Sequence, residues 1–133
     1  MVVLMVRSLA LIVAAFVIAG LDGAVTRGQT PGGRTQRVAM TAERFSFTPS
    51  RVRTKVGTAL TISLTSDDTA HGFRIVGTDV NIEIPKRSRG AATVTFTPER
   101  AGRYVFECSQ LCGAGHEFMR GEIIVSDDEG ERP

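Results

Sequence analysis

The amino-acid sequence predicts an all-β domain, a Greek-key β-sandwich or barrel, that follows one hydrophobic N-terminal segment. After residue 37, apolar residues alternate with polar ones, and turn-forming residues separate the alternating runs. This part of the chain contains no long capped run with a helical period. Side chains two positions apart lie on one face of a strand, so each run predicts a half-buried strand. About seven or eight such strands at this spacing are typical of a sandwich or barrel.

The N-terminal segment, residues 1–24, differs in composition from the rest of the chain. Residues 9–21 (LALIVAAFVIAGL) are all apolar or small, and they lie between Arg7 and Asp22. This length is typical of the hydrophobic region of a signal peptide. Residues 1–6 are also apolar, so residues 1–21 are long enough to span a bilayer. We predict a signal peptide or a membrane anchor, and in either case an exported domain on the periplasmic or other extracytoplasmic face.

The remaining chain divides into a linker, a domain and a tail. Residues 25–37 (VTRGQTPGGRTQR) show no apolar period, which predicts a flexible linker. Residues 38–126 carry the alternating pattern and form the predicted domain, and residues 127–133 (DDEGERP) form an acidic tail. The formal net charge is +2, without a long block of like charge. We therefore expect no nucleic-acid partner.

Inside the predicted domain, the inward-facing side chains recur at every second position. They are Leu60, Ile62 and Leu64; Phe73 and Ile75; Val80, Ile82 and Ile84; Val94 and Phe96; Tyr104 and Phe106; and Ile123 and Val125. The position of Cys108 continues the stripe of Phe106, and His71 begins the stripe of Phe73. If these two strand ends lie at the same pole of the sandwich, His71 can reach the loop that follows Cys108.

That loop, CSQLCGAGHEFM at residues 108–119, concentrates side chains that bind metals. Cys108 and Cys112 are the two cysteines of the chain, and His71 and His116 are its two histidines. Met119 adds a thioether to this set. Thiolate and thioether ligands favour copper, zinc or iron–sulfur clusters, and imidazole favours copper or zinc.

Several kinds of site could use these residues. A disulfide between the cysteines would close a very short loop and leave the other side chains without a shared role. A structural zinc site would use two Cys and two His but not Met119. A single blue-copper site would leave one thiol unused, and a Cys–His nucleophile would need an orienting group that the sequence does not reveal. Two thiolates that bridge two copper ions, each with one imidazole, would use the whole set.

The loop resembles the copper A motif of cytochrome c oxidase subunit II, C-x3-C-x3-H-x2-M, which has a further His upstream. His71, within DDTAHGF, fits this upstream position. The stretches FSFTP (residues 45–49), GTDVNIEIP (77–85) and AGRYVFEC (101–108) are also similar to this family. The resemblance extends from about residue 38 to residue 125, which is nearly all of the predicted domain.

The resemblance implies a cupredoxin fold and a dinuclear copper A centre with two copper ions and no haem in this chain. The implied ligands are the bridging thiolates of Cys108 and Cys112, the imidazoles of His71 and His116, the thioether of Met119 and the backbone carbonyl of Gln110. The implied role is electron transfer from a c-type cytochrome or small copper protein to the haem–copper subunit I of a membrane-bound oxidase. The chain itself would then catalyse no reaction alone. The alternative is a free-standing periplasmic copper protein that serves another reductase or delivers copper.

Three features depart from the common form of this family. Gln110 stands where many subunits II have a Glu whose side chain serves a magnesium or manganese site, so that hard-metal site is not expected here. One hydrophobic segment replaces the usual two, which is similar to the B-type branch of haem–copper oxidases. The chain has no Trp, so Phe73 or Phe118 could line the surface that receives the electron, or both could be packing residues.

Overall fold

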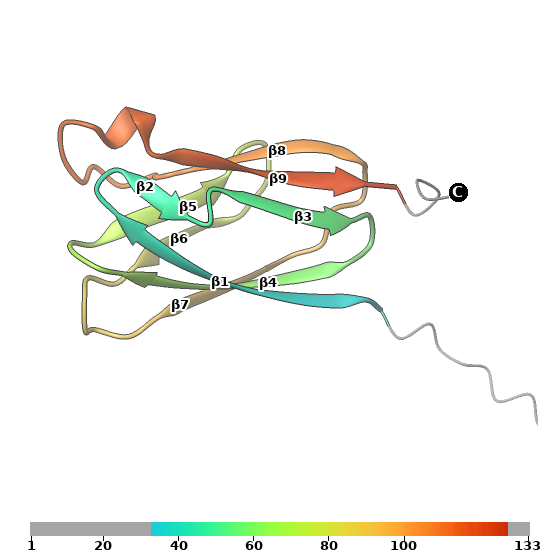
Figure 1. The fold of residues 1–133 in the computed structure, drawn as a ribbon, viewed down its shortest axis with the longest axis horizontal. Coiled ribbons are helices and arrows are strands. Elements are labelled where there is room, and N and C mark those ends of the chain that lie inside the picture. The colour runs from blue at the N-terminus through green and yellow to red at the C-terminus, as the bar shows by residue number, and fades with distance from the viewer. Residues whose placement is uncertain (1–32, 128–133) are drawn as a thin grey trace, which may run out of the picture. The chain divides into compact units, whose positions relative to one another are not determined.

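The computed structural model describes residues 33–127, in which nine β-strands form two sheets (Figure 1). The strands are β1 (Thr35–Glu43), β2 (Ser46–Thr48), β3 (Arg51–Lys55), β4 (Ala59–Ser66), β5 (His71–Ile75), β6 (Asn81–Ile84), β7 (Ala92–Phe96), β8 (Gly102–Glu107) and β9 (Arg120–Ser126). One short 3-10 helix, η1 (His116–Phe118), precedes β9. The predicted signal peptide or anchor, the linker up to residue 32 and the tail after Asp127 lie outside the described residues. Within residues 33–127, no helix has the length and apolar character needed to cross a membrane.

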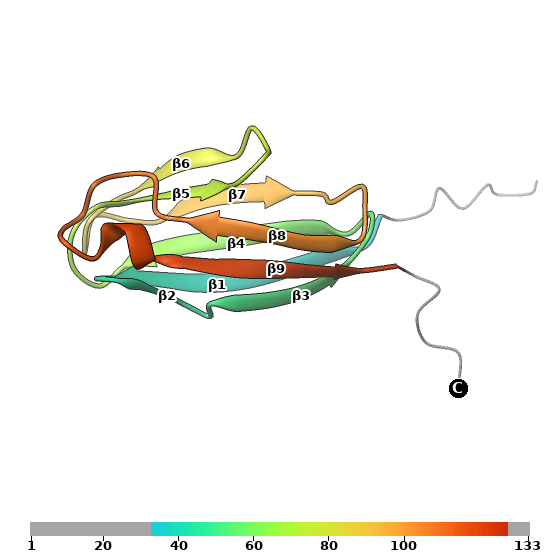
Figure 2. The same ribbon diagram turned by 90° about the horizontal axis from the view of Figure 1, so that it is seen from above.

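The two sheets pack face to face, which confirms the predicted β-sandwich. One sheet has the order β2-β1-β4-β7 and the other the order β3-β9-β8-β5-β6. Each sheet is mixed, because β1 pairs with β4 and β3 pairs with β9 in parallel, whereas the remaining pairs are antiparallel. Both views place the loop that carries η1 at one end of the sandwich and the last residues of β9 at the other (Figures 1 and 2).

The first strand begins at Thr35, before the predicted domain boundary at Val38. Its first residues are polar, but they pair with β4 in the register Thr35↔Ala59 and Gln36↔Leu60. Backbone hydrogen bonds to a neighbouring strand can order a segment whose side chains give no apolar signal. The second strand, of three residues, is likewise too short to show an alternating pattern, which explains why nine strands are present instead of seven or eight.

The predicted inward stripes form the core between the sheets. Leu60, Ile62 and Leu64 of β4 are fully buried. Three phenylalanine rings pack together across the sandwich: the centroids of Phe47 and Phe73 are 5.8 Å apart, those of Phe47 and Phe106 5.4 Å, and those of Phe73 and Phe106 5.3 Å. Because Phe73 is fully buried in this cluster, it is a packing residue and lines no surface. Of the two candidates for an electron-receiving surface, Phe118 is the exposed one.

Gly72 of β5 allows the loop after β8 to lie directly against this strand. A Cβ atom at residue 72 would stand 2.2 Å from Ser109 Oγ and 2.7 Å from the backbone nitrogen of Gln110. Both distances are shorter than any normal van der Waals contact. The missing side chain therefore lets the residue next to His71 touch the start of the cysteine loop.

We expect Gly72→Ala to lower the free energy of unfolding of the metal-free domain by about 1–3 kcal/mol, because the new methyl group must push the loop away from β5. Gly33→Ala is the matched control, since a Cβ atom there has no neighbour within 4 Å. The control should change stability by no more than about 0.5 kcal/mol. Chemical denaturation followed by circular dichroism measures both, and equal stabilities of the two variants would show that the loop is not held closely against β5.

Candidate metal centre

The pairing of β5 with β8 brings the upstream histidine to the cysteine loop. These strands are antiparallel, in the register Arg74↔Glu107 and Ile75↔Phe106. The first residue of β5, His71, therefore lies beside the start of the loop that follows β8. The predicted condition, that both strand ends share one pole, is met.

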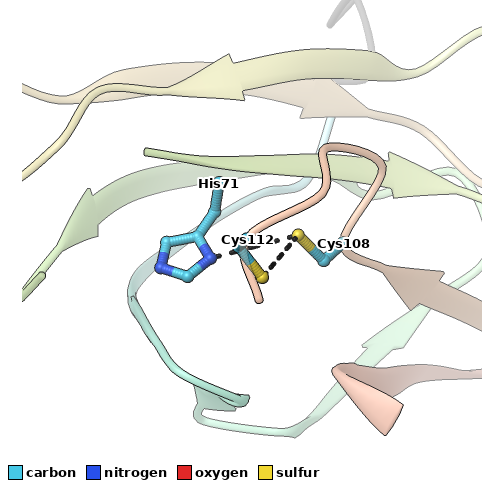
Figure 3. A group of neighbouring side chains, drawn as sticks. All are labelled: His71, Cys108 and Cys112. Atoms are coloured by element: carbon cyan, nitrogen blue, oxygen red, sulfur yellow. Dashed lines mark hydrogen bonds between the residues drawn. The ribbon is translucent and has the colours of Figure 1, made fainter. Parts of the chain in front are cut away.

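Three of the predicted ligand atoms form a compact buried group (Figure 3). The sulfur atoms of Cys108 and Cys112 are 3.7 Å apart, and Nδ1 of His71 is 4.0 Å from the Cys108 sulfur. All three ligand atoms lie within 4.8 Å of one another. Two metal–ligand bonds of about 2.0–2.3 Å can together span at most about 4.6 Å. The sulfur–sulfur and sulfur–nitrogen separations are therefore short enough for these atoms to share a metal ion.

Each of the remaining predicted ligands lies close to one of the two cysteine sulfurs. Nδ1 of His116 is 3.8 Å and Sδ of Met119 is 3.9 Å from the sulfur of Cys112. The carbonyl oxygen of Gln110 lies 3.1 Å from the sulfur of Cys108. His116 does not belong to the compact group of His71 and the two cysteines. Each imidazole therefore has its own cysteine, and the two imidazoles do not converge on a single point.

Both cysteines are free thiols in the structure. Their 3.7 Å separation is far longer than the S–S bond of about 2.05 Å in a disulfide. Burial in the domain, together with the hydrogen bond and the charge of neighbouring Cys108, raises the pKa of the Cys112 thiol to about 11. The thiol therefore keeps its proton at neutral pH until a metal ion displaces it.

The cysteine loop is folded back on itself and packed against the turn between β1 and β2. The backbone nitrogen of Cys108 donates a hydrogen bond to the carbonyl of Met119 (3.0 Å), which closes the loop at its base. The ring of Phe45 lies so close that a Cβ atom at Gly115 would stand 2.3 Å from it. Gly113, with φ +145°, also faces this ring. These two glycines let an aromatic ring cover the loop backbone.

A carboxylate that was not predicted as part of the site orients His71. Oδ1 of Asp68 lies 2.7 Å from Nε2 of His71, so Nδ1 of the same ring is left to face the thiols. Burial opposes ionisation of Asp68, but the hydrogen bond to His71 and those from the backbone of Arg44 and Thr69 outweigh it and lower its pKa to about 2. Metal-binding histidines commonly have such a carboxylate on their other nitrogen. The signal in the sequence was an Asp three residues before His71, in a turn.

Only part of the candidate centre approaches the surface. His71, Cys108, Cys112 and Met119 are buried, whereas His116 is partly exposed. Two apolar side chains of the same loop, Leu111 and Phe118, are 81% and 75% exposed. A small cavity beside His116 is lined by the charged side chains of Arg74, Glu107, Glu117 and Arg120.

The donor set selects the kind of metal. It offers two thiols, two imidazoles and a thioether, with one backbone carbonyl as its oxygen donor, whereas magnesium and calcium require several oxygen ligands. Soft sulfur ligands combined with imidazole suit copper. The residues present therefore fit copper, and the predicted ligand residues all lie at this one pole.

The sequence matches a family defined by the description "Cupredoxin-like domain" over residues 8–125. Cytochrome c oxidase subunit 2 of Thermus thermophilus is 33% identical over 96 residues, which cover 72% of this chain and 70% of that protein. Nitrous-oxide reductase of Stutzerimonas stutzeri is 30% identical over 97 residues, which cover 70% of this chain and 15% of the reductase.

A solved structure supports the same assignment. The chain resembles one chain of a haem–copper terminal oxidase dimer, with 26% identity and a TM-score of 0.61, over 74% of this chain and 68% of the other. Family match, sequence relatives and fold agree with one another. The chain therefore belongs to the cupredoxin-like domain family, as a domain of the cytochrome c oxidase subunit 2 type.

Proposed function

We propose that this domain is an electron carrier that holds two copper ions in a copper A centre. The thiolates of Cys108 and Cys112 bridge both ions, and His71 and His116 each bind one of them. Met119 and the carbonyl of Gln110 are the weaker ligands. The observation that carries this proposal is that each imidazole lies beside a different cysteine, while the two sulfurs lie 3.7 Å apart.

The geometry favours this assignment over a single-metal site. A tetrahedral zinc site made from the two thiols and the two imidazoles would need both imidazoles to point to one centre, but His116 lies outside the group formed by His71 and the two thiols. A single blue-copper site would leave one buried thiol without a role. Met119, fully buried against Cys112, has a function in a copper site but rarely in a zinc site.

The function that this centre supports best is electron transfer within a terminal oxidase. The domain would accept an electron from a c-type cytochrome or a small copper protein and pass it to the haem–copper subunit, as in the subunit 2 proteins that it resembles. A charge shared by two bridged metal ions changes each metal–ligand bond only slightly on reduction, which favours fast transfer. Among the side chains proposed as copper ligands, His116 is the partly exposed one and therefore the ligand nearest to a partner protein at the surface.

A second candidate function is electron delivery to another reductase by a free-standing copper protein in the periplasm. The similarity to nitrous-oxide reductase favours it, because a segment similar to this chain also occurs in that enzyme, where it covers 15% of the length. Both functions require export, for which the hydrophobic segment at residues 9–21 provides the signal or the anchor. Mass spectrometry of the mature N-terminus separates them: retention of the segment favours a membrane-bound oxidase subunit, and cleavage favours the free protein.

We expect the copper-loaded protein to contain two copper ions per chain. Its electron paramagnetic resonance spectrum should show one electron shared by two copper nuclei, with more and narrower hyperfine lines than one copper nucleus produces. Cys112→Ser should remove this shared signal, because one bridging thiolate is lost, and leave at most one copper ion per chain. One copper ion per wild-type chain, or a spectrum from a single nucleus, would contradict the dinuclear assignment.

Met119→Leu should keep both copper ions and raise the reduction potential. The thioether stabilises the more electron-poor oxidised form, and leucine fills the same buried space at a cost below about 1.5 kcal/mol. The shift should be on the order of tens of millivolts, since a tenfold change in a one-electron equilibrium is about 59 mV. Voltammetry measures it. If Met119→Leu emptied the site, Met119 would be a principal ligand, and the division of ligand roles proposed here would be wrong.

Copper affinity should rise with pH. The pKa of Cys112 is about 11 in the metal-free domain, so a metal ion that binds its thiolate at neutral pH must release a proton. Each released proton makes the apparent affinity about tenfold greater per pH unit between about pH 6 and 8. Competition with a chelator, corrected for the chelator's own protonation, measures this slope. An affinity that stayed constant over this range would mean that the thiol is not a ligand.

A further inference from the structure

One exposed arginine connects the two segments that carry the candidate ligands. Arg44 lies in the turn between β1 and β2, and its side-chain Nε donates a hydrogen bond to the carbonyl of Cys112 (2.7 Å). Its backbone nitrogen donates a second hydrogen bond to Oδ2 of Asp68 (3.0 Å). The other oxygen of Asp68 lies 2.7 Å from Nε2 of His71. A continuous chain of contacts therefore runs from Cys112 through Arg44 and Asp68 to His71.

The middle of the cysteine loop has few other polar attachments. The backbone hydrogen bond from Cys108 to the carbonyl of Met119 closes the loop at its base. The hydroxyl of Ser109 donates a hydrogen bond to Oδ1 of Asn81 on β6. Among the described residues, one hydrogen bond joins residues 110–115 to a residue outside the loop, and Arg44 donates it. The position of Cys112 relative to His71 therefore depends on this arginine and on packing.

Packing from the same turn supports this contact. The neighbouring residue, Phe45, covers Gly113 and Gly115, on either side of the middle of the loop. A side chain at residue 115 would collide with its ring. The turn thus holds the loop by a ring contact and by the Arg44 hydrogen bond, while the start of β5 meets it at Ser109.

We propose that Arg44 is a positioning residue of the metal centre, whose side chain sets the place of Cys112 relative to His71. This inference rests on the proposed function in that both residues are taken as ligands of the same copper pair. A substitution of Arg44 tests its side chain alone. Any residue except proline still has the backbone N–H that donates a hydrogen bond to Asp68.

Two substitutions separate the hydrogen bond from the charge. Arg44→Met removes both the donor and the positive charge. Arg44→Gln removes the charge but retains an N–H donor, Nε2, at the same number of bonds from the backbone as Nε of arginine. Arg37→Met is the matched control, because Arg37 is an exposed arginine of β1 near the other end of that strand.

We expect Arg44→Met to weaken copper binding about 10–100-fold, as the loss of a group that orients a ligand typically does. Its absorption and paramagnetic resonance spectra should also differ from those of the wild type. Arg44→Gln should restore the wild-type spectra and bring the affinity to within about threefold, since a neutral donor makes a slightly weaker bond. Arg37→Met should match the wild type. An Arg44→Met protein with wild-type affinity and spectra, or an Arg44→Gln protein as impaired as Arg44→Met, would overturn the proposal.

A metal-free measurement keeps this test separate from the proposed function. In the reduced apoprotein, the rate at which an aromatic disulfide reagent modifies the two thiols reports how well the loop is held. Arg44→Met should raise that rate about tenfold, with little change for Arg44→Gln, because thiol reactivity depends on access. Unchanged rates in Arg44→Met would overturn the role of Arg44 whatever metal is bound. A wild-type protein without a dinuclear copper signal would instead overturn the proposed function.

Discussion

The register between β5 and β8 is the constraint on which the candidate centre depends. It places the first residue of β5 beside the start of the loop that follows β8. Nδ1 of His71 thus lies 4.0 Å from the sulfur of Cys108, although 37 residues separate the two in sequence. A shift of one residue would turn His71 to the opposite face of the sheet. The buried rings of Phe73 in β5 and Phe106 in β8 pack on each other and so stabilise this register. The hydrophobic core thus determines where the candidate metal ligands meet.

Burial and metal binding are coupled in this arrangement. An unpaired thiolate would be costly in the domain interior, so burial and the nearby Cys108 raise the pKa of Cys112 and keep its thiol neutral. A metal ion changes this balance because its positive charge compensates the thiolates that it binds. The same enclosure keeps the ligands in nearly fixed positions, which an electron carrier requires. Asp68 contributes by fixing the ring of His71 through its outer nitrogen.

Several residues of the cysteine loop are exposed, and two of them, Leu111 and Phe118, have large apolar side chains. His116 is partly exposed, whereas the side chains of His71, Cys108, Cys112 and Met119 are buried. Two arginines and two glutamates, Arg74, Arg120, Glu107 and Glu117, line the cavity beside His116. The surface at this end of the sandwich therefore combines exposed apolar side chains with charged groups of both signs.

The all-β class, the inward-facing stripes and the loop with two cysteines, a histidine and a methionine could all be predicted from the amino-acid sequence. These properties depend on the two-residue period of a strand and on the chemistry of a few side chains, both of which are local. Three features of the candidate centre became visible in the folded chain alone. His71 reaches the loop, His116 lies outside the compact group of His71 and the two cysteines, and Asp68 holds the ring of His71. The same holds for the burial of Phe73 in the core and for the start of the first strand at Thr35. Such features depend on strand pairing between distant segments, and the period of a single strand holds no information about its partner.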